Sequence, residues 1–211
     1  MKADITQVYY MGDGATPTYA GGRESQLLAM AEAAGEHCAQ TFLRLALQTQ
    51  GRALFTLRMF NPDMAGLAHR IASPNVLPGL GDAGAHVSQV MDAGWASFVL
   101  SHWVREQRLY TLAEGVRRLT GAPAAVLGLK DRGLLAVGQR ADVNVFDADR
   151  IGERQPEIVH DFPGGAARYI QRGVGYKATL VNGRVNLLDG EFTGERAGQV
   201  LRHGAAARSA A

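Results

Sequence analysis

Hydrophobic residues between positions 24 and 49 recur at helical spacing on both sides of a glycine. Leu27 and Leu28 precede Gly35, and Phe42 and Leu45 follow it. An apolar face that repeats every three or four residues is typical of an amphipathic helix, and glycine interrupts such a pattern. The spacing therefore predicts two helices separated at Gly35.

Two short apolar runs are each followed by a helical pattern. The run at 53–60 precedes Asn61-Pro62-Asp63, which offers an N-cap and a first-turn proline for a helix through Ile71. The run at 76–80 precedes the glycine-rich turn 81–84 and a helical pattern from about 88 to 105. Alternating strands and helices predict a parallel sheet with buried strands.

Two more helical segments follow, and after them the hydrophobic pattern changes. Thr111, with Glu114 three positions later, predicts the N-terminus of a helix over 111–119, and 122–127 reads as another short helix. After Gly128 the apolar residues alternate in short segments at 134–135, 141–146, 176–181 and 184–188. Asn182-Gly183 is typical of a two-residue hairpin turn. We expect antiparallel strands over 130–204 and a disordered tail over 205–211.

The number of strand–helix units limits the fold. A complete eight-stranded (β/α) barrel takes about 250 residues, and only two units are visible here. Two parallel strands cannot close a barrel and would leave main-chain groups unpaired at their edges. The chain is therefore expected to be incomplete on its own.

Composition narrows the class of protein. The 211 residues are 46% hydrophobic and 20% charged, with a net charge of +2, which is enough to bury a core and excludes whole-chain disorder. One cysteine excludes an internal disulfide and a zinc site built from several thiolates. The basic residues form no run, which disfavours nucleic acid as a partner. No membrane-spanning stretch or secretory signal is recognisable, so we expect a cytoplasmic protein.

The clearest candidate for chemistry is Gly81-Asp82-Ala83-Gly84-Ala85-His86. A carboxylate directly after a barrel strand can ligate a metal and accept a proton from water. Alternatively, Asp82 caps the following turn or helix, because Asp and Gly are ordinary turn residues. His86 could be a second ligand, a substrate contact or a helix-start residue. Loops near Asn61 and His86 are expected to line the substrate site.

Other candidates receive less support from the sequence. His37, His69, His160 and His203 form no pair two or four residues apart, so the chain cannot build a zinc site unaided. His102 and Trp103 fall on a long helical pattern, where packing is the commoner role. No Gly-x-Ser-x-Gly elbow or phosphate-binding glycine loop occurs, which disfavours acyl-enzyme and nucleotide chemistry.

Residues 120–147 resemble a known family. They read Thr-Gly-Ala-Pro-Ala-Ala-Val-Leu-Gly-Leu, then Arg-Gly-Leu-Leu, then Ala-Asp-Val-Asn-Val-Phe-Asp, and this pattern is similar to the C-terminal hallmark of the amidohydrolase superfamily. Four further segments resemble the N-acyl-D-amino-acid deacylase (D-aminoacylase) branch: 80–86, 101–105, 159–161 and 176–183.

The resemblance implies a zinc hydrolase that cleaves the amide of a small-molecule N-acylated D-amino acid. Its fold would be α/β, with residues 1–129 as the C-terminal part of a (β/α)8 TIM-like barrel and residues 130–204 as antiparallel strands of a small, composite β-sandwich. Asp82 would be the metal-site residue and the general acid/base. The family's His-x-His ligands are absent, so the remaining zinc ligands are not in this chain.

Three hypotheses remain open at this stage. The chain is the C-terminal portion of such a hydrolase, inactive until a missing N-terminal barrel half supplies the other ligands. Alternatively, it is a non-catalytic truncated or assembly module stabilised by a homo-oligomer partner. In the third hypothesis the superfamily is the same and the substrate is a cyclic amide or ureide.

Overall fold

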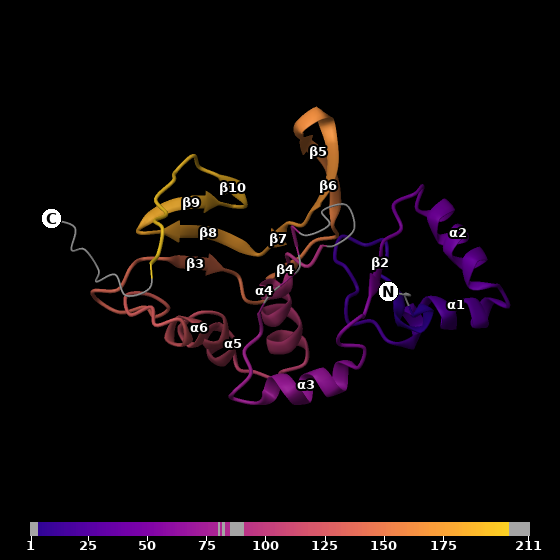
Figure 1. Cartoon of the computed structure of the whole chain (residues 1–211), viewed down its shortest axis with the longest axis horizontal. Coiled ribbons are helices and arrows are strands. Elements are labelled where there is room, and N and C mark those ends of the chain that lie inside the picture. The colour runs from indigo at the N-terminus through magenta and orange to yellow at the C-terminus, as the bar shows by residue number, and fades with distance from the viewer. Residues whose placement is uncertain (1–3, 80, 82, 85–90, 203–211) are drawn as a thin grey trace. The chain divides into compact units, whose positions relative to one another are not determined.

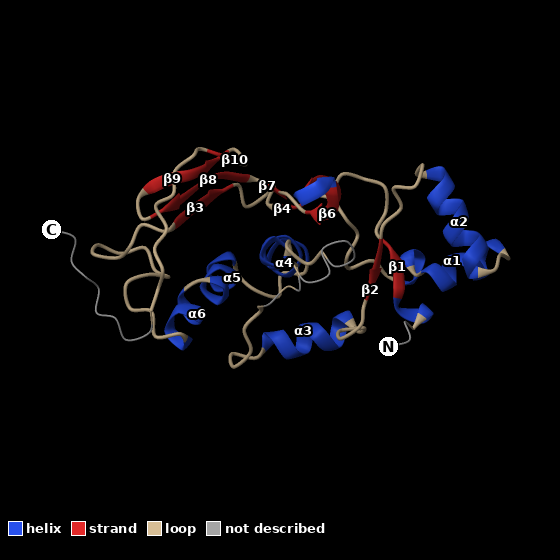
Figure 2. Cartoon of the chain, turned by 45° about the horizontal axis from the view of Figure 1, so that its top comes forward, coloured by secondary structure: helices blue, strands red, loops and turns tan. Residues whose placement is uncertain are grey.

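A computed structural model describes residues 4–79, 81, 83, 84 and 91–202 of the chain. The chain contacts define two compact units, Met1–Arg70 and Ile71–Ala211. Figure 1 traces the chain by residue number, and Figure 2 separates its helices from its strands. Within the described part of the chain, no helix is long and apolar enough to cross a membrane. The expected disordered tail, 205–211, lies outside the described residues.

The described part of the first unit contains one pair of strands. β1 (Val8–Tyr10) and β2 (Phe55–Leu57) are antiparallel, with Val8 opposite Leu57 and Tyr10 opposite Phe55. The strand predicted at 53–60 is confirmed, but its expected parallel pairing is wrong. An antiparallel partner needs no crossover helix, so β1 satisfies the main-chain groups of β2 directly.

Both helices predicted around Gly35 are present. α1 (Leu27–Ala34) ends at Gly35, whose φ of 64° is left-handed and suits glycine. α2 (Cys38–Gln48) begins after His37, whose ring accepts a backbone hydrogen bond while the Gln40 side chain accepts from the His37 amide at 2.8 Å. Short 3-10 turns lie at Ile5–Gln7 and Arg23–Ser25. The buried apolar residues of the unit include Tyr9, Met11, Leu27, Ala31 and Leu45.

α3 (Met64–Ala72) confirms the helix predicted through Ile71. Asp63 supplies its N-terminal hydrogen bonds, accepting from the amides of Ala65 and Gly66 at 3.0 and 2.9 Å. The strand expected next is wrong over its described residues, 76–79, which lie in no strand. Pro78 has no N–H to donate to a ladder, and Leu80 lies outside the described residues.

Between Trp95 and Val126 the second unit is mainly helical. The helical segments there are α4 (Trp95–Phe98), a π-helix (Val99–Glu106), α5 (Leu112–Leu119) and α6 (Gly121–Val126). The helix expected from about 88 begins only at Trp95 among the described residues, since 91–94 are not helical. The predicted start of α5 is confirmed, because the Thr111 hydroxyl accepts from the Glu114 amide at 3.2 Å. His102 and Trp103 are buried, as expected.

An antiparallel sheet dominates the C-terminal half of this unit. Its order is β10 (Glu191–Phe192), β9 (Arg184–Leu188), β8 (Tyr176–Val181) and β3 (Val143–Phe146). The hairpin turn at Asn182-Gly183 is confirmed, with φ of 51° and 78°. The strand expected at 134–135 is wrong: Leu134 and Leu135 are 66% and 84% exposed and pair with no strand among the described residues.

Two smaller pairs of strands complete the unit. β4 (Gly152–Glu153) pairs with β7 (Gly173–Val174), and β5 (Glu157–Phe162) pairs with β6 (Ala166–Ile170) across a turn at Pro163–Gly165. All of these pairs are antiparallel. The antiparallel region expected over 130–204 includes these four strands, but the sequence pattern located none of them individually. Two of them are only two residues long, and β5 is mostly exposed.

Candidate functional site

The segment that carries the predicted catalytic residue is described in part. Asp82 and His86 lie outside the described residues, so their predicted roles stay predictions. Gly81 is described, and a Cβ atom built on it would collide with the Asp92 carbonyl oxygen and lie 2.8 Å from Cδ1 of Trp95. The backbone directly before Asp82 is therefore packed against the start of α4.

Asn61, predicted to contact substrate, lies in the loop before α3. Its side chain is exposed, and its Oδ1 accepts a hydrogen bond from Nη2 of Arg70 at 3.1 Å. Asn61 belongs to the first unit and Gly81 to the second. Its role at a substrate site therefore stays a prediction.

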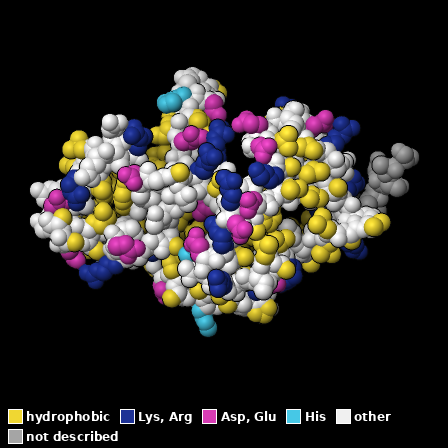
Figure 3. Space-filling model, turned by 180° about the vertical axis from the view of Figure 1, so that it is seen from behind, with side chains coloured by type: hydrophobic (Ala, Val, Ile, Leu, Met, Phe, Trp, Pro, Cys, Tyr) yellow, Lys and Arg dark blue, Asp and Glu magenta, His cyan; other side chains and the backbone are white. Residues whose placement is uncertain are grey.

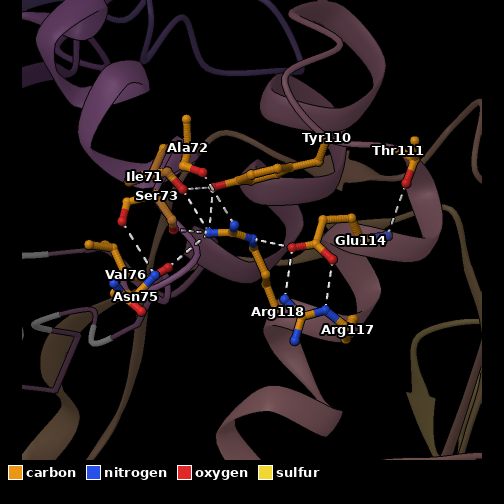
Figure 4. A network of polar contacts seen from close by, with 10 residues as sticks. All are labelled: Ile71, Ala72, Ser73, Asn75, Val76, Tyr110, Thr111, Glu114, Arg117 and Arg118. Atoms are coloured by element: carbon orange, nitrogen blue, oxygen red, sulfur yellow. Dashed lines mark hydrogen bonds and ion pairs between the residues drawn. The ribbon is translucent and has the colours of Figure 1, made fainter.

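A buried arginine on α5 holds the chain that leads toward Gly81 (Figure 4). The Arg118 side chain is 4% exposed. Its Nη1 donates to the carbonyl oxygens of Ile71, Ser73 and Val76 at 2.7, 2.9 and 2.8 Å. The last carbonyls of a helix lack intrahelical donors, and the helix dipole makes that end negative. Arg118 thus caps the C-terminus of α3 and binds the turn that follows it.

Two side chains complete the surroundings of Arg118. Oε1 of Glu114 accepts from its Nε at 2.6 Å, and the ring of Tyr110 lies 4.6 Å from its Cζ. The Tyr110 hydroxyl donates to the Ile71 carbonyl at 2.5 Å. Hydrogen bonds from Arg117 and Arg118 lower the pKa of Glu114 to about 2, so this carboxylate stays ionised near neutrality. The buried guanidinium is therefore both charge-compensated and hydrogen-bonded.

A second polar cluster lies between the π-helix and β4. The Glu153 side chain is buried, and its Oε2 accepts from the Ser101 hydroxyl at 3.4 Å. Burial raises the pKa of Glu153 to about 7, and the negative charge of Glu106 also raises it, whereas Arg105 lowers it. Arg105 donates to the Ile151 carbonyl at 2.6 Å and so fixes the chain before β4.

Glu153 also borders a cavity of about 660 Å³. Gly94 and Ser97 line the cavity from the side of α4, and its lining also includes Gln171, which follows β6, and Tyr176, which begins β8. The hydroxyl groups of Ser97 and Tyr176 are 3.0 Å apart, and the Gly94 amide donates to Oε1 of Gln171 at 3.0 Å. Polar contacts thus join α4 to the strands at the cavity wall.

The described residues do not fit a zinc ion by themselves. No group of three His, Cys, Asp or Glu side chains that could hold a metal is present in the part of the chain that the structure describes. His102, a possible imidazole ligand by type, instead faces Oε2 of Glu106 at 2.9 Å and stacks on Phe98.

Sequence reasoning missed Arg118, Tyr110 and Glu153. The spacing of Glu114 and Arg118, four residues apart on a predicted helix, signals an ion pair. It does not signal burial, because the carbonyl partners of Arg118 lie more than 40 residues earlier in the chain. Glu153 gave no sequence signal, because its burial depends on packing between β4 and a distant helix.

Residues 69–186, more than half of the chain, match the model described as the Amidohydrolase family. The chain belongs to the amidohydrolase family.

Its similarity to curated proteins points to one branch of that family. N-acyl-D-aspartate deacylase of Alcaligenes xylosoxydans xylosoxydans is 44% identical over 113 residues, which are 52% of this chain and 21% of the relative. N-acyl-D-glutamate deacylase of the same organism is 55% identical over 62 residues, 28% of this chain and 13% of the relative. The resemblance to the D-aminoacylase branch is therefore confirmed. A dihydroorotase of Lactobacillus johnsonii is 38% identical over 65 residues, 31% of this chain and 14% of the relative.

Solved structures confirm the fold class. N-acyl-D-glutamate deacylase from Bordetella bronchiseptica, complexed with zinc and a phosphonate inhibitor, is 28% identical with a TM-score of 0.52, over 93% of this chain and 38% of its own. A D-aminoacylase mutant in complex with CuCl2 is 25% identical with a TM-score of 0.55, over 95% of this chain and 39% of its own. The chain thus has the fold of the C-terminal barrel part and β-strands of these enzymes and spans about two fifths of their length.

Proposed function

We propose that this chain is the C-terminal portion of a zinc-dependent amidohydrolase that hydrolyses the amide bond of N-acyl-D-amino acids. The observation that carries this proposal is the 44% identity to N-acyl-D-aspartate deacylase over 113 residues. The sequence contains no His-x-His pair, and the remaining zinc ligands would come from residues outside this chain. In this proposal the protein acts in the cytoplasm, and its partner is the missing barrel half or another copy.

Within this proposal, residues 1–129 complete a barrel and residues 130–204 contribute to a composite β-sandwich. Asp82 is the metal-site residue and the acid/base. Its carboxylate accepts a proton as water adds to the amide carbonyl carbon, and it returns that proton to the leaving nitrogen as the C–N bond breaks. The products are a carboxylic acid and a free D-amino acid. Asn61 and His86 contact the substrate.

A substrate panel tests the proposed reaction. The polypeptide encoded by the complete reading frame is supplied with zinc and assayed for free amino acid released from N-acetylated D-Asp, D-Glu and D-Leu, and from their L-enantiomers. We expect release from the D-substrates and little from the L-forms. Absence of hydrolysis in every preparation that binds zinc would contradict the proposal and support the non-catalytic alternative.

A cyclic amide substrate is the second candidate, because a dihydroorotase is among the similar proteins. Dihydroorotate and a hydantoin therefore belong in the same panel. Ring opening of either one without hydrolysis of N-acyl-D-amino acids would replace the first proposal with the second.

A further inference from the structure

Three arginines border the cavity beside Glu153. Arg150 and Arg154 lie on either side of β4, and Arg172 directly precedes β7. All three line the cavity of about 660 Å³ and are exposed to solvent. The cavity therefore gathers positive side chains from two segments that are separate in sequence.

The pairing of β4 with β7 sets Arg154 directly against Arg172. The two strands are antiparallel, with Glu153 opposite Gly173. The next pair in this register is Arg154 and Arg172, and the Arg154 amide donates to the Arg172 carbonyl at 2.9 Å. Side chains directly opposite in an antiparallel pair are neighbours on one face, and like charges there are destabilising. The backbone thus places two positive side chains next to each other.

Gly175 brings the turn that carries Arg150 against the chain that follows β7. Its φ of 84° is left-handed, and a Cβ atom there would lie 2.6 Å from the Ile151 nitrogen and 2.8 Å from the Arg150 carbonyl carbon. The Asp147 amide donates to the Gly175 carbonyl at 2.8 Å. Only glycine permits this close approach, so Arg150 is held beside the same pair of strands.

Acidic partners neutralise these arginines only in part. Nε of Arg172 donates to Oε1 of Glu157 at 2.8 Å, and both side chains are more than half exposed. Among the described residues, the side chains of Arg150 and Arg154 have no hydrogen-bond or ion-pair partner. Two guanidinium groups are therefore free to bind an anion from outside the described chain.

The cavity lining also contains four acidic side chains: Asp147, Glu153, Asp189 and Glu191. None of the four forms a salt bridge with the three arginines within the part of the chain that the structure describes. Oδ1 of Asp189 instead lies 3.8 Å from Nζ of Lys177, and Oε2 of Glu153 accepts from the buried Ser101 hydroxyl. The acidic lining therefore does not occupy the donors of the arginines.

We propose that Arg150, Arg154 and Arg172 form a binding site for a small-molecule oxyanion with more than one negative charge, a polycarboxylate or a phosphate compound. A guanidinium presents a planar fork of donors that matches carboxylate and phosphate oxygens. An anion between Arg154 and Arg172 replaces their repulsion with charge-assisted hydrogen bonds. The cavity volume lies within the range of small-molecule sites, about 300–1,000 Å³. This inference does not depend on the proposed function.

Isothermal titration calorimetry of the full chain at low ionic strength tests the site with citrate, pyrophosphate and acetate. We expect citrate or pyrophosphate to bind at least about tenfold more tightly than acetate, because one additional charge-assisted hydrogen bond is worth about that factor. A preference for citrate identifies a carboxylate site, and a preference for pyrophosphate identifies a phosphate site. Absence of binding, or equal affinity for acetate, would overturn the proposal.

Arginine variants locate the site. Arg154→Ala should weaken binding of citrate or pyrophosphate at least about tenfold, and Arg154→Lys should fall between the two, because an ammonium keeps the charge and lacks the fork. Arg184→Ala is the matched control, because Arg184 is exposed, lies 3.3 Å from Glu195 and is absent from the cavity lining. It should keep wild-type affinity, and an equal loss in Arg184→Ala would mean non-specific attraction and overturn the site.

Thermal unfolding separates binding from a structural role of Arg154. Without ligand, Arg154→Ala should unfold at or above the wild-type Tm, because repulsion from Arg172 is removed. Citrate or pyrophosphate should raise the Tm of the wild type and of Arg184→Ala but not that of Arg154→Ala. An equal rise in Arg154→Ala would overturn the site. Arg150→Ala serves in both measurements if Arg154→Ala does not fold.

The same titration on the complete polypeptide distinguishes a small-molecule ligand from an acidic segment of the remaining protein. Binding of citrate or pyrophosphate with similar affinity by the complete polypeptide supports the proposal. Binding by this chain that is lost in the complete polypeptide would show that other residues cover the arginines, and it would overturn the small-molecule site.

Discussion

The fold raises the pKa of the Glu153 carboxyl. Its pKa of about 7 lies well above its ordinary value of 4.5, because burial between β4 and the π-helix disfavours the charge. Ser101 is its hydrogen-bond partner, and Glu106 and Arg105 on the same helix act on it with opposite signs. Burial at this site therefore stabilises the protonated form of Glu153 relative to the ionised form.

This shift predicts a pH-dependent stability. Below pH 4.5 the Glu153 carboxyl is neutral in both the folded and the unfolded chain, so it does not change the free energy of unfolding with pH. Between pH 4.5 and 7 the unfolded chain loses its proton first, so the free energy of unfolding falls by up to roughly 3 kcal/mol, and above pH 7 the loss is complete. Urea unfolding, monitored by tryptophan fluorescence at several pH values, measures this change in the free energy of unfolding. Trp95 and Trp103 both lie in the second unit with Glu153.

Glu153→Gln should remove this part of the pH dependence, while exposed Glu191→Gln should keep it. An equally steep fall in stability from pH 4.5 to 7 in Glu153→Gln would show that another group is responsible.

Among the secondary-structure elements, α5 has an N-terminus whose capping residue can be tested by mutation. Thr111 caps the helix by accepting from the Glu114 amide. Thr111→Ala should lower the free energy of unfolding of the second unit by about 1 kcal/mol, since the amide loses its acceptor. Thr111→Ser keeps the hydroxyl and should stay near wild type. Chemical denaturation compares the three proteins, and equal midpoints for Ala and Ser would contradict the capping role.

Elements with strong local signals could be predicted from the sequence. Gly35, Asp63 and Thr111 each mark a helix end through a conformation or hydrogen bond made within three residues. Asn182-Gly183 marks a hairpin for the same reason. In these places the chain's local preference and its tertiary structure agree.

Elements that depend on distant partners could not be predicted. The run at 76–80 reads as a strand, yet the Val76 carbonyl is bound by Arg118, 42 positions away. β2 reads as a parallel strand, yet its partner is β1. The polar cluster around Arg118 shows the same limit, because its contacts depend on packing between segments that are remote in sequence.

At the scale of the whole molecule, the chain spans about two fifths of the solved relatives' length. Large apolar side chains are exposed at its surface, as Figure 3 shows for one face. The most exposed include Leu47, Phe60, Val126, Leu135 and Val137. Single exposed apolar side chains are common on protein surfaces, so their exposure alone does not identify a partner.

In the proposed reaction, Asp82 transfers the proton during amide hydrolysis. The most direct measurement compares kcat for an N-acyl-D-amino acid in the complete polypeptide and its Asp82→Asn variant, with exposed Asp149→Asn as the control. Loss of an acid/base should lower kcat by roughly 10²–10⁴-fold while unfolding midpoints stay equal and Asp149→Asn keeps wild-type turnover. Wild-type kcat in a folded Asp82→Asn protein would contradict the account.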